Sequence, residues 1–243
     1  MELKDIFKIA GIIFILCILL VVPYVTSAKV SETKHNLSVS GPGPIKAVEE
    51  TQICIFCHTP HSSESIYPLW NHEVSSFQSY INYWSPTLQA YDFEEAPPID
   101  GFSKLCLSCH DGTIAIGAVL NREEDILMSP SPYLDAQGRL LPGAKGYLGT
   151  DLSGGHPISF IFDEFLAAKR NDAGLTKLNW PISDNDVKLY PTQGGYGVQC
   201  PSCHDPHNNK AAGGWPPFWR KETHDEVCMV CHDSEIPEGV IEW

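Results

Sequence analysis

One five-residue pattern, Cys-x-x-Cys-His, occurs four times in this sequence of 243 residues and constrains its fold more than any other feature. The copies run over Cys54–His58, Cys106–His110, Cys200–His204 and Cys228–His232. On a helical turn, residues at positions i, i+3 and i+4 share one face, so each copy presents two thiols and one imidazole together. The chain must therefore fold around whatever these groups of side chains hold.

The pattern is the attachment signature of c-type haem. Two thiols can reach the two vinyl groups on one edge of a porphyrin, while the imidazole reaches the iron. Structural zinc, disulfides or a thioredoxin-like motif account for cysteine pairs, but not for a histidine directly after every pair. We therefore expect four covalently bound haem c groups with their iron. The expected attachment residues are Cys54, Cys57, Cys106, Cys109, Cys200, Cys203, Cys228 and Cys231, and the proximal iron ligands are His58, His110, His204 and His232.

The remaining histidines indicate what fills the sixth position of each iron. Of the ten histidines, the four proximal ones leave six, whereas Met128 is the only methionine outside the N-terminal segment and the motifs. Histidines can therefore complete every iron, and methionines cannot. An iron with histidine on both sides has no vacant position for a substrate. The expected function is electron transfer, without enzymatic activity.

An internal repeat predicts which histidines are the distal ligands. The order His-x-(Leu/Ile)-Ser, CxxCHxPH, Pro-x-Trp, CxxCHD occurs twice, which indicates two-haem units over about 29–120 and 150–243. His61 and His207 each follow a proximal histidine by three residues and cannot swing to the opposite face of their own haem. We expect each to bind the iron of a neighbouring haem. The predicted distal set is His35, His61, His156 and His207.

His72 is a fifth candidate that the repeat does not explain, because Lys221 stands at the corresponding place in the second unit. Two interpretations are open. His72 either replaces His35 or His61 as an iron ligand, or it hydrogen-bonds beside a site. His224 precedes Cys228 by four residues, has no counterpart in the first unit, and is expected to be exposed.

The N-terminus has the pattern of an export signal. Lys4 and Lys8 precede an uncharged stretch from Ile9 to Ala28 that closes on small residues. We expect residues 1–28 to be a cleaved signal peptide, leaving a mature chain of residues 29–243 without a stable membrane anchor. The alternative is an uncleaved anchor, since roughly 20 uncharged residues can span a bilayer. Cleavage predicts a secreted protein, extracellular or at the cell surface, with the periplasm as the alternative location.

Charge and composition restrict partners and architecture. A formal charge of −14 excludes nucleic acid as a partner, because no counterions are released from phosphates by an acidic chain. Nineteen glycines and nineteen prolines interrupt the chain too often for long elements. We expect mostly irregular coil with a few short helices wrapped around the four haems, and little or no β-sheet. Short helices are predicted over 163–171, whose terminal charges suit the helix dipole, and over 111–120.

A resemblance to a known family extends these expectations. Residues 35–43, 53–61, 68–72, 105–113, 156–159 and 200–208 resemble secreted multihaem c-type cytochromes with doubled CxxCH motifs. They are most similar to the tetrahaem extracellular cytochromes of metal-reducing bacteria and some archaea, several of which form filaments. The likeness implies bis-His ligation, haems in alternating parallel and T-shaped pairs, and a distal histidine that an adjacent protomer can supply. It favours His72 as a ligand, against the set from the repeat, and leaves residues 121–150 unmatched.

Together these features predict a secreted tetrahaem cytochrome with low reduction potentials, since no axial methionine raises them. Its expected partners are redox proteins or extracellular acceptors, and the resemblance implies a homo-polymer with a continuous chain of haems. The alternatives are a monomeric periplasmic electron shuttle, a membrane cytochrome that oxidises quinol, and a multihaem oxyanion reductase. The reductase would need an open iron, often marked by a CxxCK motif that this sequence lacks.

Overall fold

The computed structural model describes residues 29–61, 67, 69–77, 79–208 and 218–233. Irregular backbone predominates, and the regular elements are short. They are the 3-10 helices η1 (Lys29–Glu32), η2 (Cys54–Phe56) and η3 (Phe93–Glu95), the α-helices α2 (Gly101–His110), α3 (Glu164–Asp172), α4 (Cys200–Cys203) and α5 (His224–Cys228), and the strands β1 (Phe160–Ile161), β2 (Tyr190–Thr192) and β3 (Gly195–Val198). None of the helices in the described part of the chain is long and apolar enough to cross a membrane.

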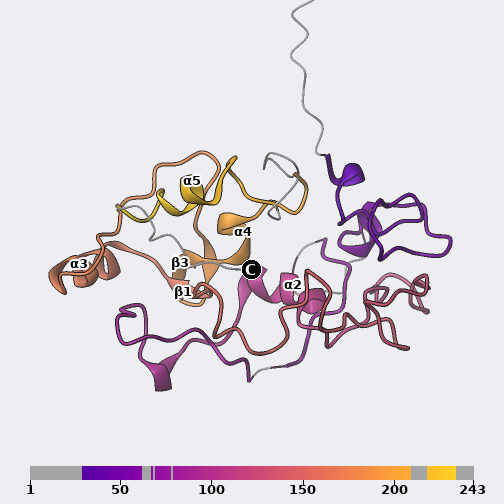
Figure 1. The fold of residues 1–243 in the computed structure, drawn as a ribbon, viewed down its shortest axis with the longest axis horizontal. Helices are drawn as coiled ribbons and strands as arrows, with labels where there is room; N and C mark the ends of the chain where they lie inside the picture. Colours follow the sequence, from indigo (N-terminus) through magenta and orange to yellow (C-terminus); the bar gives the residue numbers. More distant parts are fainter. Residues whose placement is uncertain (1–28, 62–66, 68, 78, 209–217, 234–243) are drawn as a thin grey trace, which may run out of the picture.

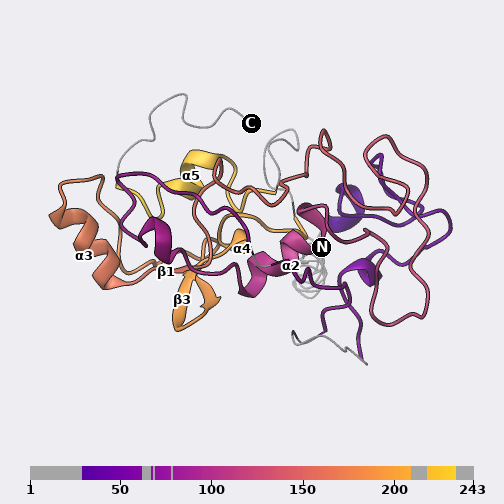
Figure 2. The ribbon, with the colours of Figure 1, turned by 90° about the horizontal axis from the view of Figure 1, so that it is seen from below.

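The molecule is elongated, and α2 and α4, which carry the second and third motifs, lie near its middle. In Figures 1 and 2, α3 lies at one end, and the loops from residues 29–60 and 121–150 lie together at the other. Between them, α2 packs against α4, which brings the helix of the second motif onto the helix of the third. Residues about 100 positions apart in the sequence therefore meet at the centre.

The two helix predictions have different outcomes. The helix predicted over 163–171 is confirmed as α3, whose first turn is capped by the Asp163 carboxylate accepting from Leu166 N–H at 2.9 Å. The helix predicted over 111–120 is wrong, because α2 ends at His110. There Asp111 accepts from the backbone of Thr113 at 2.7 Å, and Gly112 takes a left-handed φ of +72°, which stops the helix. The second motif therefore closes a helix rather than beginning one.

The expectation of little or no β-sheet is wrong, although most of the fold is coil. Three antiparallel strands pair in the order β1-β3-β2. A two-residue turn, Gln193-Gly194, joins β2 to β3, and Gly194 takes the positive φ (+90°) that favours glycine at the second position of a type II turn. Gly197 lies in β3 because a Cβ there would fall 1.8 Å from the Phe160 carbonyl oxygen. The glycines that indicated a loop from sequence are therefore the residues that permit this sheet.

Among the described residues, four small apolar clusters stand in place of a single core, and each packs against the second cysteine of a different motif. Phe56 and its neighbours contact Cys57, and the Ile116 cluster contacts Cys109. The Trp219 and Val227 cluster contacts Cys203, and the cluster formed by Phe160, Phe162 and Val198 contacts Cys231. Each motif thus has its own apolar wall.

A buried polar network fixes α2 against the start of α4. Gln199, with no exposed surface, accepts from Ser103 N–H at 2.8 Å and donates to the Asp100 carboxylate at 2.9 Å. Ser103 Oγ in turn accepts from Cys200 N–H at 3.0 Å. These bonds satisfy backbone groups at both helix N-termini, so the second and third motifs are held in a defined relative position.

Candidate functional site

All four motifs form helical turns with the same backbone bond. The N–H of His58 donates to the Cys54 carbonyl at 2.8 Å, and the corresponding bonds are 3.1 Å for His204 and 3.0 Å for His232. His110 is the last residue of α2. None of the eight described cysteines forms a disulfide. Each turn therefore offers two thiols and an imidazole at the spacing that thioether attachment of a haem requires.

Three proximal histidines face a second histidine at a common separation. The ring centroids of His58 and His207 are 6.0 Å apart, those of His35 and His110 6.0 Å, and those of His156 and His232 6.4 Å. Bonds of about 2 Å from one metal ion to two imidazoles on opposite sides place the centroids about 6 Å apart. The pairs therefore have the spacing that a haem iron between them needs, and the residues present fit that group.

The pairing brings together three of the four distal histidines predicted from the repeat: His35, His156 and His207. His207 follows the third motif and faces the proximal histidine of the first, so the ring reaches a neighbouring motif. His204 stacks on Trp219, with centroids 4.5 Å apart. The iron partner of His61, which is exposed beside the first motif, stays a prediction.

His72 contacts a cysteine rather than a proximal imidazole. The ring is fully buried, with Nδ1 2.8 Å from the Glu73 carbonyl, and Nε2 3.1 Å from the Ala115 carbonyl and 3.5 Å from Cys109 Sγ. Burial lowers the pKa of His72, but the interaction with Cys109 and the hydrogen bonds to the Glu73 and Ala115 carbonyls together raise it to about 9. With both nitrogens engaged, His72 fits a group that hydrogen-bonds beside the second motif. His224 is half-exposed, and its Nε2 lies 2.8 Å from an Asp225 carboxylate oxygen.

Hydrogen bonds on the far side of the paired rings hold their orientation. Backbone carbonyls lie within reach of Nδ1 in three of them: Pro206 for His35 at 3.2 Å, Gly146 for His110 at 2.5 Å, and Pro157 for His156 at 2.7 Å. A carbonyl at Nδ1 selects the tautomer in which Nε2 keeps its lone pair for a metal. His207 instead has the Asp205 carboxylate 3.5 Å from Nδ1.

Burial lowers the pKa of five of the paired histidines. Burial, reinforced by the neighbouring His110, lowers the pKa of His35 to about 4, and burial beside His156 lowers that of His232 to about 4. Burial also lowers the pKa of His58, His110 and His156. Neutral imidazole is the form that binds a metal. The lowered pKa of these five rings therefore favours the form that can act as a ligand.

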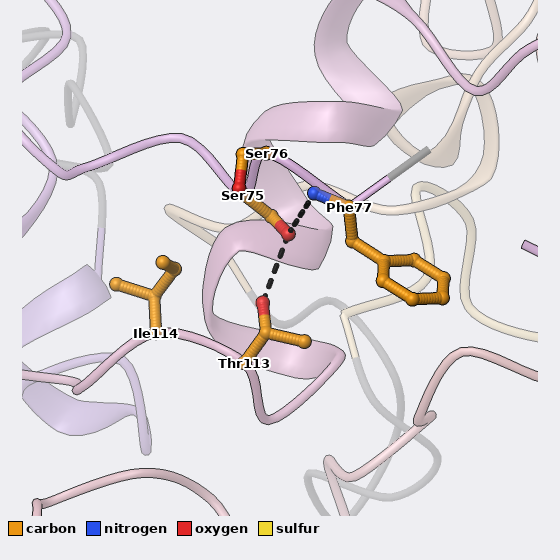
Figure 3. A pocket seen from close by; sticks show the side chains of 5 residues that line it. All are labelled: Ser75, Ser76, Phe77, Thr113 and Ile114. Carbon is orange, nitrogen blue, oxygen red and sulfur yellow. Dashed lines mark hydrogen bonds between the residues drawn. The ribbon is translucent and has the colours of Figure 1, made fainter. Parts of the chain in front are cut away.

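The space beside the second motif is hollow. A cavity of about 380 Å³ is bordered by Ser75–Phe77 and by Thr113 and Ile114, which follow His110 (Figure 3). Ser75 Oγ and Thr113 Oγ1 are 2.9 Å apart on its wall, and the Phe77 ring and Ile114 supply apolar surface.

Sequence reasoning missed two contacts around His35. Phe218, the middle residue of the repeated Pro-x-Trp, stacks on the His35 ring at 4.4 Å, and the Pro206 carbonyl lies at Nδ1. The repeat had pointed to the tryptophan and not to the residue before it. The only sequence signal for Phe218 is its place inside that repeated tripeptide.

The doubled CXXCH motif family model matches residues 192–236, which include the third and fourth motifs. No curated protein matches the chain. The match supports a multihaem c-type cytochrome with covalently bound haem c, and with it a role in electron transfer.

Proposed function

We propose that this protein is a secreted tetrahaem cytochrome c that transfers electrons through closed, bis-His iron sites. The observation that carries the proposal is the set of three facing histidine pairs, each joining a CxxCH histidine to a distal one at 6.0 to 6.4 Å. A bound haem c supplies an iron that gains and loses one electron. The family match to the doubled motif supports the same chemistry.

The proposed axial pairs are His58 with His207, His110 with His35, His232 with His156, and His204 with His61. The first three rest on the ring pairs in the structure. The fourth follows from the repeat, because His207 of the third motif reaches the first, and the equivalent His61 of the first would reach the third. The cysteines of each motif would hold the edge of the porphyrin.

The protein's own groups keep these sites closed and relatively dry. Apolar clusters pack against the second cysteine of every motif and reduce access of water. Carbonyls at Nδ1 keep His35, His110 and His156 oriented as their partners require. Two histidines on each iron leave no position for a substrate, so we assign no enzymatic activity. Histidine ligands and the charge of −14 favour the ferric state and hence low potentials.

We further propose that the mature chain, beginning near Lys29, acts outside the cell or at its surface and polymerises into a continuous chain of haems. Redox proteins or extracellular acceptors would be its partners. Support comes from the N-terminal pattern and from the family resemblance. N-terminal sequencing tests cleavage. Electron microscopy of secreted material tests assembly, where filaments support the proposal and discrete particles at high protein concentration favour a periplasmic shuttle.

The deciding experiment is spectroscopy of the purified holoprotein. Iron and haem quantification should give four haems per chain, and the ferric form should be low-spin. The angle between the two axial rings shapes the low-spin EPR signal. The pairs at 70° and 79° should therefore give signals distinct from the pair at 21°. A substantial high-spin fraction in the native protein would refute closed sites and favour a reductase.

A further inference from the structure

The ring of His35 is held by a part of the chain remote from its own backbone. Its backbone N–H bonds to Thr33 Oγ1 at 3.3 Å, within the first repeat unit. Its ring, however, lies flat against Phe218, with centroids 4.4 Å apart and planes only 8° from parallel. On the ring edge, Nδ1 is 3.2 Å from the Pro206 carbonyl. Both contacts come from the loop around the third motif.

Phe218 occupies a backbone conformation that non-glycine residues rarely adopt. Its φ is +62°, and such a residue persists only where its surroundings enforce the strain. Here the Phe218 carbonyl accepts from Asp205 N–H at 2.8 Å, and Arg220 N–H donates to the Cys203 carbonyl at 3.0 Å. These bonds tie the strained residue to the third motif, so its ring has a fixed direction.

The first repeat unit has the same backbone conformation and hydrogen bonds at the equivalent position, but with a different side chain. Leu69 has φ +62°, its carbonyl accepts from Thr59 N–H at 3.0 Å, and Asn71 N–H donates to the Cys57 carbonyl at 3.0 Å. The Leu69 side chain is 51% exposed, whereas the Phe218 ring lies on an imidazole. The backbone is the same in both units, so the feature that differs in the second unit is the aromatic ring of Phe218.

We propose that Phe218 and the Pro206 carbonyl are positioning groups that hold the His35 ring crosswise to His110. The flat contact fixes the plane of the His35 ring, and the Nδ1 bond fixes its rotation within that plane. Together they set the 70° angle between the two imidazoles of this pair. The inference rests on the proposed function, since it assumes that both rings bind one iron. It makes the third motif's loop responsible for ligand geometry at the second motif.

The test compares ferric EPR spectra of the holoprotein with those of Phe218→Ala, Phe218→Tyr and Leu69→Ala. Phe218→Ala removes the stacked ring, and we expect one of the low-spin signals to shift while the others stay unchanged. Phe218→Tyr keeps a flat ring and should restore the original signal. Leu69→Ala removes a side chain from the same strained backbone conformation and should shift none. Haem content and circular dichroism establish that each variant is folded.

Several results would overturn the inference. An unchanged spectrum in Phe218→Ala, the same shift in Phe218→Tyr, or an equal shift in Leu69→Ala would each do so. If Phe218→Ala does not accumulate, Phe218→Leu, which copies the first unit, replaces it under the same criteria. A wild-type protein without low-spin haems would instead overturn the proposed function. Low-spin haems that are insensitive to residue 218 would overturn the positioning role alone.

Discussion

Replacing Gln199 by alanine should weaken the packing of α2 against α4, which carry the second and third motifs. The side chain is fully buried and bonds to two groups on the α2 side, Ser103 N–H at 2.8 Å and the Asp100 carboxylate at 2.9 Å. Alanine can replace neither bond. Ser103 has no exposed surface, so water does not readily take over its N–H.

The expected loss follows from the two bonds. Leaving a buried N–H without a partner costs about 1–3 kcal/mol, and a hydrogen bond to a charged group contributes about 1.5–3 kcal/mol. Asp100 keeps its bonds from Thr192 Oγ1 and Gln193 N–H, so the second contribution falls at the lower end. We therefore expect Gln199→Ala to lower the free energy of unfolding by about 2–4 kcal/mol.

The assay is guanidinium unfolding of the holoprotein, followed by the Soret band as axial histidines detach. Gln193→Ala is the matched control, because Gln193 bonds to the same carboxylate through its backbone N–H and its side chain is exposed. The control should stay within about 0.5 kcal/mol of the parent. A loss for Gln199→Ala no larger than that of the control, at an unchanged denaturant slope, would refute the reasoning.

Three further outcomes are expected. His207→Ala should open the site of His58 and add a high-spin ferric signal for one haem at unchanged haem content, whereas His224→Ala should leave the spectrum as it is. Burial raises the pKa of Asp184, but its bond to Lys221 at 2.6 Å outweighs this and lowers it. This pair should add up to about 1 kcal/mol to the free energy of unfolding near neutral pH, and the contribution should be lost as the pH falls below the normal aspartate pKa. In Asp184→Asn, this part of the pH dependence of stability should be absent. A haem-free variant with all eight motif cysteines changed to serine should show no cooperative thermal transition, because its apolar clusters are small; a sharp calorimetric peak would contradict this.

The sequence predicted the features that depend on local spacing. The turns around His58 and His204 follow from the i, i+3, i+4 geometry of the motif. The pairing of His207 with a neighbouring motif followed from its short distance to His204, which prevents it from crossing its own haem. Helix α3 could be predicted because its capping aspartate and terminal charges lie within the helix itself or next to it.

Features that depend on distant contacts could not be predicted. Helix α2 begins at Gly101 with φ +51°, where a Cβ would lie 2.8 Å from the Pro191 carbonyl, a residue 90 positions away. The sheet was missed because glycines are depleted from strands in general, while Gly197 is needed here for close approach to Phe160. His72 was ambiguous because only tertiary packing brings it to Cys109.

The reach of His207 from one predicted repeat unit to the other resembles a domain swap carried out within one chain. His207 leaves its own half to face His58, and the loop of the same half holds the ring of His35. A protein made from the first half alone would have His58 without His207. It would also have His35 without the Phe218 and Pro206 contacts that hold its ring. Each half of the chain therefore depends on contacts with the other, and the two predicted units are interlocked.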